Sequence, residues 1–117
     1  DAVPDGDGDK GPWKPRKLAY VARIRARENE DALLVEACDK LANLYDLVED
    51  LEFDSADAFE KFNGGKEMTL EYYATLGEVL LPQVRVPALI AEYSRLLARL
   101  QNLANVDTIR IWTADET

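Results

Sequence analysis

Two polar side chains in the middle of the sequence, Asp39 and Asn43, have types and a spacing that could do chemistry. Residues four apart on an α-helix project from the same face, so these two would lie together. A carboxylate is a ligand that a divalent metal ion accepts, but such an ion takes about four to six ligands. One aspartate in a sequence without histidine cannot complete that set. The alternative is that both are ordinary polar residues on the flank of an amphipathic helix.

Basic residues are concentrated in one segment near the N-terminus, where the predicted helix carries Arg16, Lys17, Arg23, Arg25 and Arg27. The arginines near its C-terminal end suit the negative end of the helix dipole. Arg16 and Lys17 lie at its start and are the first candidates for contact with an anion, because cationic side chains offset charge on phosphoryl oxygens. They are equally well explained as surface charges.

Composition limits the classes of function. The chain of 117 residues fits one domain, 1–117, and its formal net charge is −9. That charge argues against broad binding to nucleic acid or to an anionic membrane. No apolar run approaches the roughly 18–20 residues of a membrane span. The single cysteine, Cys38, permits no internal disulfide and favours a reducing, cytoplasmic location, and its apolar neighbours predict that it is buried.

The elements that must position these residues are helical. Apolar residues recur at steps of three and four, which predicts an all-α, compact bundle of about five helices over 13–27, 31–51, 56–62, 67–81 and 87–103. Pro82 and Pro87 mark the break before the last helix. The helix over 31–51 is expected to be central. Its predicted buried stripe is Leu34, Cys38, Leu41, Tyr45 and Val48, widened by Leu33, Ala37, Leu44 and Leu51. Trp13, Tyr20, Tyr45 and Tyr73 are expected in the core.

The two ends of the chain are expected to be irregular. Residues 1–12 contain three glycines and two prolines and are predicted to form a loop. Its alternating aspartates resemble the start of a calcium loop, but Lys10 and Arg16 stand where the turn glycine and the bidentate glutamate belong. Residues 108–112 alternate like a strand without a partner strand. They are predicted to be an extended tail or a docking segment.

Three blocks of residues, in order, resemble the C-terminal half of an HD-superfamily metal-dependent phosphohydrolase. Residues 12–17 followed by Tyr20 are similar to a "W..RK..Y" helix entry. Residues 34–44, which read LVEACDKLANL, are similar to "lv.aaDKlhNl" and form the specific block. Residues 59–62 with 71–73 are similar to the "w..F…yY" that follows. The resemblance covers roughly residues 1–82.

The resemblance implies an all-α fold and a divalent metal, manganese, iron or similar, held by a His, a His-Asp pair and a later Asp. Asp39 matches that last ligand. Asn43 matches a substrate contact in the branch that hydrolyses guanosine tetraphosphate and related nucleotides, and Arg16 and Lys17 match basic positions near the phosphates. The His and His-Asp residues are not in this chain. They are expected from an N-terminal segment of the same protein or from a second chain. Ala42 also replaces the usual His of the "DKlhN" block.

The resemblance thus implies part of a phosphohydrolase that acts on phosphate or pyrophosphate esters of nucleotides and is inactive as an isolated chain. With a complete ligand set, a metal-bound water would lose a proton and attack phosphorus. A different class of function is also open: a non-catalytic helical module that binds a protein partner through an exposed apolar face. Oligomerisation is compatible with either.

Overall fold

Four α-helices make up most of the structure, a computed structural model that describes residues 13–26, 29–54 and 65–113. They are α1 (Trp13–Ala26), α2 (Glu30–Asp54), α3 (Gly65–Val84) and α4 (Pro87–Ala104). They account for 86% of the described residues, which include no strand, so the all-α prediction is confirmed. Among these helices, none combines the length and the apolar character that crossing a membrane requires.

The helices lie close to the predicted bounds, with one difference at Pro82. The expected helix over 56–62, the fifth of the bundle, and the expected loop over 1–12 lie outside the described residues. Pro82 lies inside α3, because a proline in a last turn removes only one hydrogen bond of the helix. The chain breaks instead at Arg85, which has a φ of 58°, and α4 then starts at Pro87.

Local contacts explain where several helices begin and end. Asn29 caps α2, since its Oδ1 atom accepts a hydrogen bond from the backbone N–H of Ala32 at 3.0 Å. The C-terminus of α4 is closed by Asn105 in the left-handed conformation, with a φ of 60°. Lys66 Nζ from the start of α3 donates to Ala104 O at 3.2 Å, which ties the two helix ends together.

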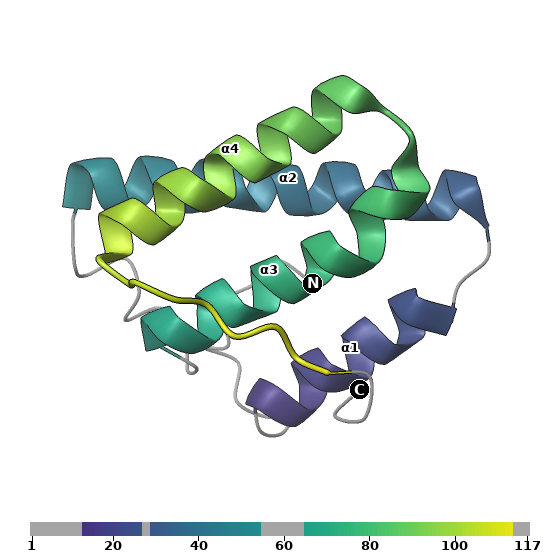
Figure 1. The fold of residues 1–117 in the computed structure, drawn as a ribbon, viewed down its shortest axis with the longest axis horizontal. Helices are drawn as coiled ribbons and strands as arrows, with labels where there is room; N and C mark the ends of the chain where they lie inside the picture. The colour runs from purple at the N-terminus through teal and green to yellow at the C-terminus, as the bar shows by residue number, and fades with distance from the viewer. Residues whose placement is uncertain (1–12, 27–28, 55–64, 114–117) are drawn as a thin grey trace.

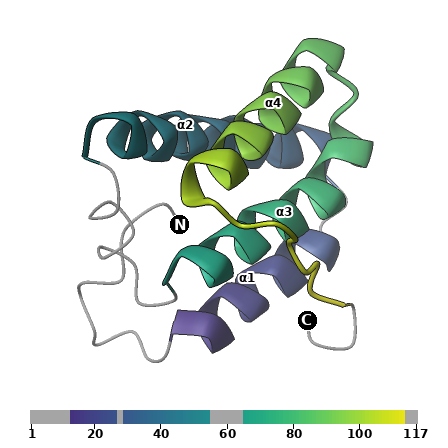
Figure 2. The same ribbon diagram turned by 60° about the vertical axis from the view of Figure 1, so that its left-hand side comes forward.

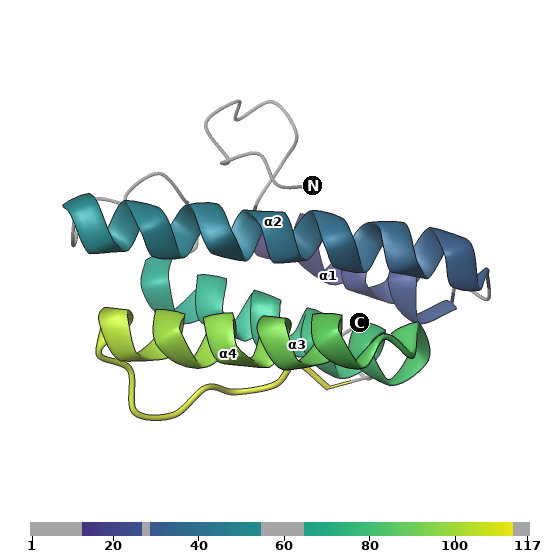
Figure 3. The same cartoon turned by 90° about the horizontal axis from the view of Figure 1, so that it is seen from above.

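The helices form two layers. Figures 1 and 3 show α1 and α2 in one layer, and α3, α4 and the C-terminal tail in the other. α2 packs against α4 and α3, and α1 packs against α3. α1 and α2 lie apart on either side of α3 in the turned view of Figure 2. Long side chains, rather than close backbone packing, therefore connect α1 to α2.

The interface between α3 and α4 is closely fitted around one tyrosine. Tyr93 of α4 is buried, and its hydroxyl donates a hydrogen bond to the backbone carbonyl of Tyr73 at 2.6 Å. Gly77 of α3 faces the Tyr93 ring, and a Cβ atom at Gly77 would lie 2.9 Å from Tyr93 Cε1. A side chain at position 77 would therefore overlap the ring.

The buried side of α2 differs from the predicted one. Cys38 and Tyr45 are exposed, so the predicted stripe was wrong at these two positions, whereas Leu34 and Leu41 are partly buried against the core and Val48 is buried. The residues expected only to widen it are instead the centre of the core: Leu33, Ala37, Leu44 and Leu51, with Leu47 and Val48. Both sets recur at helical spacing. The contacts with α3 and α4, which spacing does not specify, decide which set is buried.

The segment after α4 is extended and docks on α3, as predicted. The backbone N–H of Trp112 donates to Thr75 Oγ1 at 2.9 Å, and its indole Nε1 donates to Glu71 Oε1 at 2.8 Å. The Trp112 ring is buried beside Trp13 and Tyr72. Trp13, Tyr20 and Tyr73 are buried, so their assignment to the core is confirmed, whereas that of Tyr45 is wrong.

Candidate functional site

Two lysines are buried between α1, α2 and α3. Lys17 of α1 has 3% of its surface exposed, and Lys40 of α2 has none. Lysine is almost never fully buried unless its charge is compensated. The surroundings of these two ammonium groups therefore define the candidate functional site.

The Lys40 ammonium has few contacts for a buried cation. Its Nζ atom lies 3.3 Å from Asp39 Oδ2 and 4.5 Å from the centre of the Tyr20 ring. An ammonium has three donors, so one long hydrogen bond and one aromatic face leave donor capacity unused. The Tyr20 hydroxyl in turn donates to Glu36 Oε1 at 2.7 Å, which completes a link between α1 and α2.

Lys17 lies over a neighbouring ring. Its Nζ atom is 5.1 Å from the centre of the Tyr72 ring, and the Tyr72 and Tyr20 ring centres are 6.4 Å apart. The two lysines thus lie on two adjacent aromatic rings. Two carboxylates are close to the same rings, because Asp39 contacts Lys40 and Glu36 accepts the hydrogen bond of Tyr20, so the site combines buried ammonium groups with acidic neighbours.

Three further polar atoms around this site are buried without a hydrogen-bond partner among the described residues: Trp13 Nε1, Asn43 Nδ2 and Tyr72 Oη. An indole nitrogen and an amide nitrogen can only donate. Burial, with smaller contributions from Tyr73 and Tyr20, raises the pKa of Tyr72 far above that of a free phenol, so its hydroxyl also remains a donor. Trp13 Nε1 and Tyr72 Oη therefore call for an acceptor, whereas the Asn43 side chain lies within hydrogen-bonding reach of Tyr73.

The predicted metal ligand lies at the edge of this site. The Asp39 side chain is 46% exposed, so its carboxylate reaches solvent while it contacts the buried Lys40. Asn43 lies one turn further along α2. Burial raises the pKa of Tyr73, the Asn43 amide opposes that rise, and Asp39 adds to it. Both residues therefore lie near the same tyrosine, as their spacing predicts.

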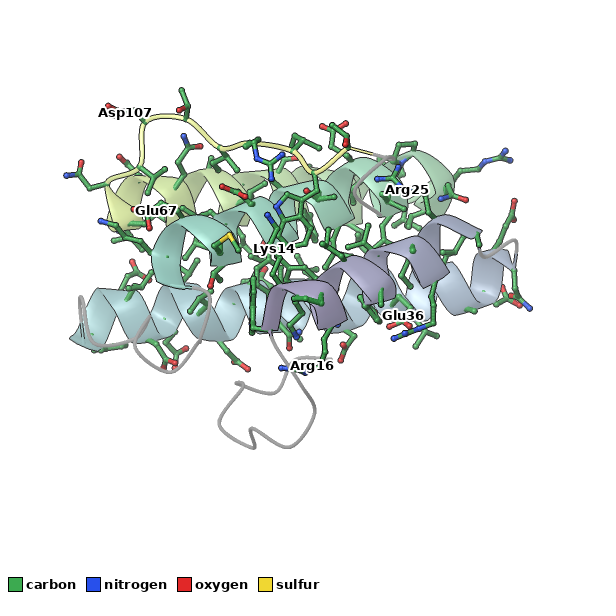
Figure 4. All side chains as sticks on the ribbon, turned by 90° about the horizontal axis from the view of Figure 1, so that it is seen from below. Lys14, Arg16, Arg25, Glu36, Glu67 and Asp107 are labelled. Atoms are coloured by element: carbon green, nitrogen blue, oxygen red, sulfur yellow. The ribbon has the colours of Figure 1, made fainter. Side chains whose placement is uncertain are left out.

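The two predicted phosphate contacts lie in different places. Lys17 points into the site, whereas Arg16 is half-buried on the outer side of the α1–α2 layer. Figure 4 shows Arg16 on the opposite side of α1 from Lys14 and Arg25, with Glu36 near α1 and α2. Successive residues of a helix project about 100° apart. Lys17 and Arg16 therefore do not form a pair of cations in one place.

Sequence reasoning missed Lys40 and the two tyrosines that support the lysines. A signal for Lys40 was present, since it follows Ala37 by three residues and precedes Leu44 by four. That spacing places it in the buried stripe of α2. Tyr20 and Tyr72 were less accessible, because their contacts join residues far apart in the sequence.

The residues of this site do not form a metal centre by themselves. In the described part of the chain, no group of three or more Cys, Asp or Glu side chains could hold a metal ion. A resident metal would therefore need most of its ligands from elsewhere, which agrees with the lone carboxylate of Asp39.

Comparisons with known proteins add no assignment. No family model matches the chain, and neither the curated proteins nor the solved structures contain a match. The resemblance to HD-type phosphohydrolases therefore rests on the residue blocks alone and stays a prediction.

Proposed function

We propose that this chain is the C-terminal part of an HD-type metal-dependent phosphohydrolase that acts on phosphate or pyrophosphate esters of nucleotides. In this proposal Asp39 is one ligand of a divalent metal, and the His and His-Asp ligands come from an upstream segment of the same protein or from a second chain. The observation that supports it best is the contact of a solvent-accessible carboxylate, Asp39, with a buried cationic site.

The position of Asp39 suits a shared ligand. A carboxylate that is half-exposed can bind an ion delivered by another segment without disruption of the core. The hydrogen bond from Lys40 is to the Oδ2 atom of the Asp39 carboxylate. The carboxylate is thus oriented by a buried side chain while it faces the surface, as a metal ligand should be.

The chemistry of the neighbouring site suits phosphate oxygens. Each phosphate oxygen accepts several hydrogen bonds, and the site contains the Lys40 ammonium, with donor capacity beyond its contact to Asp39, and the Tyr72 hydroxyl, which has no described partner. In the proposed enzyme, Lys17 offsets phosphate charge and Asn43 contacts the substrate. Arg16, on the outer side of the layer, would act only on a part of the substrate that extends there.

The decisive experiment uses the complete protein or the reconstituted assembly that contains the His and His-Asp residues. Asp39→Ala should abolish hydrolysis of guanosine tetraphosphate and lower the manganese content, and it should also lower the melting temperature, because the buried Lys40 loses the carboxylate that contacts it. Asp39→Asn keeps an oxygen for Lys40 and should lose metal and activity with a smaller change in stability. Asp46→Ala removes another exposed carboxylate of α2 and is the matched control, which should retain activity and metal. Full activity of Asp39→Ala would end the proposal.

A second candidate function is a non-catalytic helical module that binds a protein partner. One specific observation favours it: several large apolar side chains on α2 are exposed, including Val35, Tyr45 and Phe53. Such a module would keep its binding activity after Asp39→Ala, whereas the enzyme would lose its activity.

A further inference from the structure

The outer side of α2 carries a stripe of exposed apolar residues, one of which, Tyr45, reaches α4, where its hydroxyl donates a hydrogen bond to Glu92. The stripe consists of Val35, Cys38, Ala42, Tyr45 and Phe53, all exposed, and is called the outer stripe below. Its members recur at steps of three, four, three and eight residues, so they share one side of the helix. Val35 is 67% exposed and Phe53 is 85% exposed, which is far more than large apolar residues of a core helix show.

The outer stripe is long enough for a helical partner. From Val35 to Phe53 it extends over about 27 Å, at 1.5 Å per residue, and the exposed carboxylates of Asp46 and Glu49 interrupt it between Tyr45 and Phe53. The opposite side of the same helix is buried against α3 and α4 through Leu33, Leu44 and Leu51. α2 therefore has apolar residues on two opposite sides. Such a helix typically packs against a partner on each of them.

The charges around the outer stripe specify the partner. α2 contains nine Asp and Glu residues and a single basic residue, Lys40, which is buried. Asp31, Asp46 and Glu49 are exposed beside the stripe and form no ion pair with a described residue. Near Glu49, the groove between α2 and α4 also contains Arg95 and Arg99 of α4, which pair with Glu92 and Glu52. The carboxylates that remain unpaired favour a partner with Lys or Arg beside its apolar residues.

Other occupants fit less well. Nucleic acid and anionic membranes would be repelled by the carboxylates. In a second copy of this chain, α2 would bring the same carboxylates against each other. The basic helix of a second copy, α1, buries Trp13, Tyr20 and Ile24 inside its own fold and cannot offer them.

We propose that the outer stripe of α2 binds a basic amphipathic helix of a partner protein. The partner's apolar side chains contact Val35, Cys38, Ala42, Tyr45 and Phe53, and its flanking Lys or Arg side chains pair with Asp31, Asp46 and Glu49. This inference does not depend on the phosphohydrolase proposal, because none of the contacts it needs involves Asp39, Asn43 or Lys17.

The test uses the full chain and a synthetic peptide of about 20 residues, which matches the length of the stripe. The peptide places leucines at steps of three and four with lysines beside them. Its fluorescence anisotropy should rise on addition of the chain. A scrambled peptide of the same composition and a version with glutamate in place of lysine are the controls, and both should bind at least about tenfold more weakly.

Variants of the chain locate the binding surface. Val35→Ser combined with Phe53→Ser should weaken binding of the lysine–leucine peptide by about tenfold or more, because two apolar contacts are lost. Val86→Ser, an equally simple change at an exposed valine between α3 and α4, should leave binding unchanged. Both variants should keep the melting temperature, since the substituted side chains are exposed.

Cys38 provides an independent readout, because it is the only cysteine and lies within the outer stripe. Bound peptide should slow its alkylation, whereas the scrambled peptide should not. If the scrambled peptide binds as tightly as the lysine–leucine peptide, charge attraction alone explains the binding, and the proposal is overturned. A chain that forms dimers disrupted by Val35→Ser and Phe53→Ser would assign the stripe to a second copy, and would also overturn it.

Discussion

The layer of α3 and α4 differs from the layer of α1 and α2 in how completely its polar groups are hydrogen-bonded and its apolar side chains are covered. On the first, the Tyr93 hydroxyl, Thr75 and the Trp112 indole are all hydrogen-bonded, and the tail covers the outer side (Figure 3). Around the second, Lys40 is buried with one long hydrogen bond and one aromatic contact, and α2 exposes the outer stripe. The same fold therefore contains one completed side and one side that still has binding capacity.

This difference shows where function is to be sought. Groups that are fully paired contribute mainly to stability, whereas buried donors without acceptors are costly unless a ligand or partner satisfies them. Both proposals use the side with α1 and α2, one through its inner surface and the other through its outer surface. Neither uses the interface between α3 and α4.

The largest effect is expected at high pH and involves both sides. Burial raises the pKa values of Tyr72, Tyr73 and Tyr93 above that of a free phenol, so they stay neutral in the folded chain when the unfolded chain begins to ionise at about pH 10. Their contribution to stability is complete below pH 10 and is lost above it. The total loss should reach about 4 kcal/mol by pH 11, and about 3 kcal/mol of it should fall between pH 10 and pH 11.

Circular dichroism melts and tyrosinate absorbance over this pH range measure the effect. The absorbance of these three tyrosines should appear together with unfolding. Ionisation of all five tyrosines in a chain that remains folded would contradict the burial described for Tyr72, Tyr73 and Tyr93.

A smaller loss is expected from Gly77→Ala, which tests the close fit of α3 and α4. The new Cβ atom would overlap the Tyr93 ring, at a cost of about 1–3 kcal/mol. The higher helix propensity of alanine offsets about 1 kcal/mol of this. Urea unfolding should show a net loss, which should shrink in a Tyr93→Leu background. An unchanged midpoint for Gly77→Ala would mean that this interface is looser than described.

One chemical change, Tyr to Phe, should have opposite effects at Tyr93, in the interface of α3 and α4, and at Tyr72, whose ring lies on α3 beside the residues of α1. Tyr93→Phe removes a hydrogen bond to the carbonyl of Tyr73 and should cost about 1 kcal/mol. Tyr72→Phe removes a buried hydroxyl without a described partner and should stabilise the isolated chain by a similar amount, about 1 kcal/mol. Thermal melts of the two variants compare them directly. A loss of stability in Tyr72→Phe would show that the hydroxyl is already satisfied.

The smallest effect on stability is expected from Lys40→Met. Methionine fills a similar volume without a buried charge, and Asp39, which loses its partner, remains half-exposed to water. The free energy of unfolding should therefore change by less than about 1 kcal/mol, in either direction. In the complete enzyme the same variant should reduce activity, because Asp39 loses its orientation. A destabilisation of several kcal/mol would instead make Lys40 a structural residue.

The positions of the helices could be predicted from the sequence, whereas the burial of individual faces could not. The spacing of apolar residues located α1, α2, α3 and α4, because it depends on neighbours along the chain. Cys38 and Tyr45 were assigned to the core, yet α2 has apolar residues around much of its circumference. Only the approach of α3 and α4 determines which of them are covered.

The candidate site shows the same division. The common location of Asp39 and Asn43 follows from a separation of four residues, and both lie near Tyr73. The burial of Lys40 depends on the ring of Tyr20, which belongs to a different helix and lies twenty positions away in the sequence. A pattern within one helix contains no information on such a contact, so the cationic part of the site emerged only from the tertiary structure.

The docking of the tail gives the chain a local optical reporter. Its only two tryptophans, Trp13 and Trp112, have ring centres 6.3 Å apart at an interplanar angle of 83°, and Tyr72 contacts both. All tryptophan fluorescence, and any near-ultraviolet circular dichroism from coupling of the two indole rings, thus arises where the tail contacts the start of α1. A change in tryptophan fluorescence will report release of the tail even while α2 and α4 remain intact. Unfolding curves from fluorescence and from helical dichroism should therefore be recorded together, since coincident curves would show that the tail and the helices unfold as one unit.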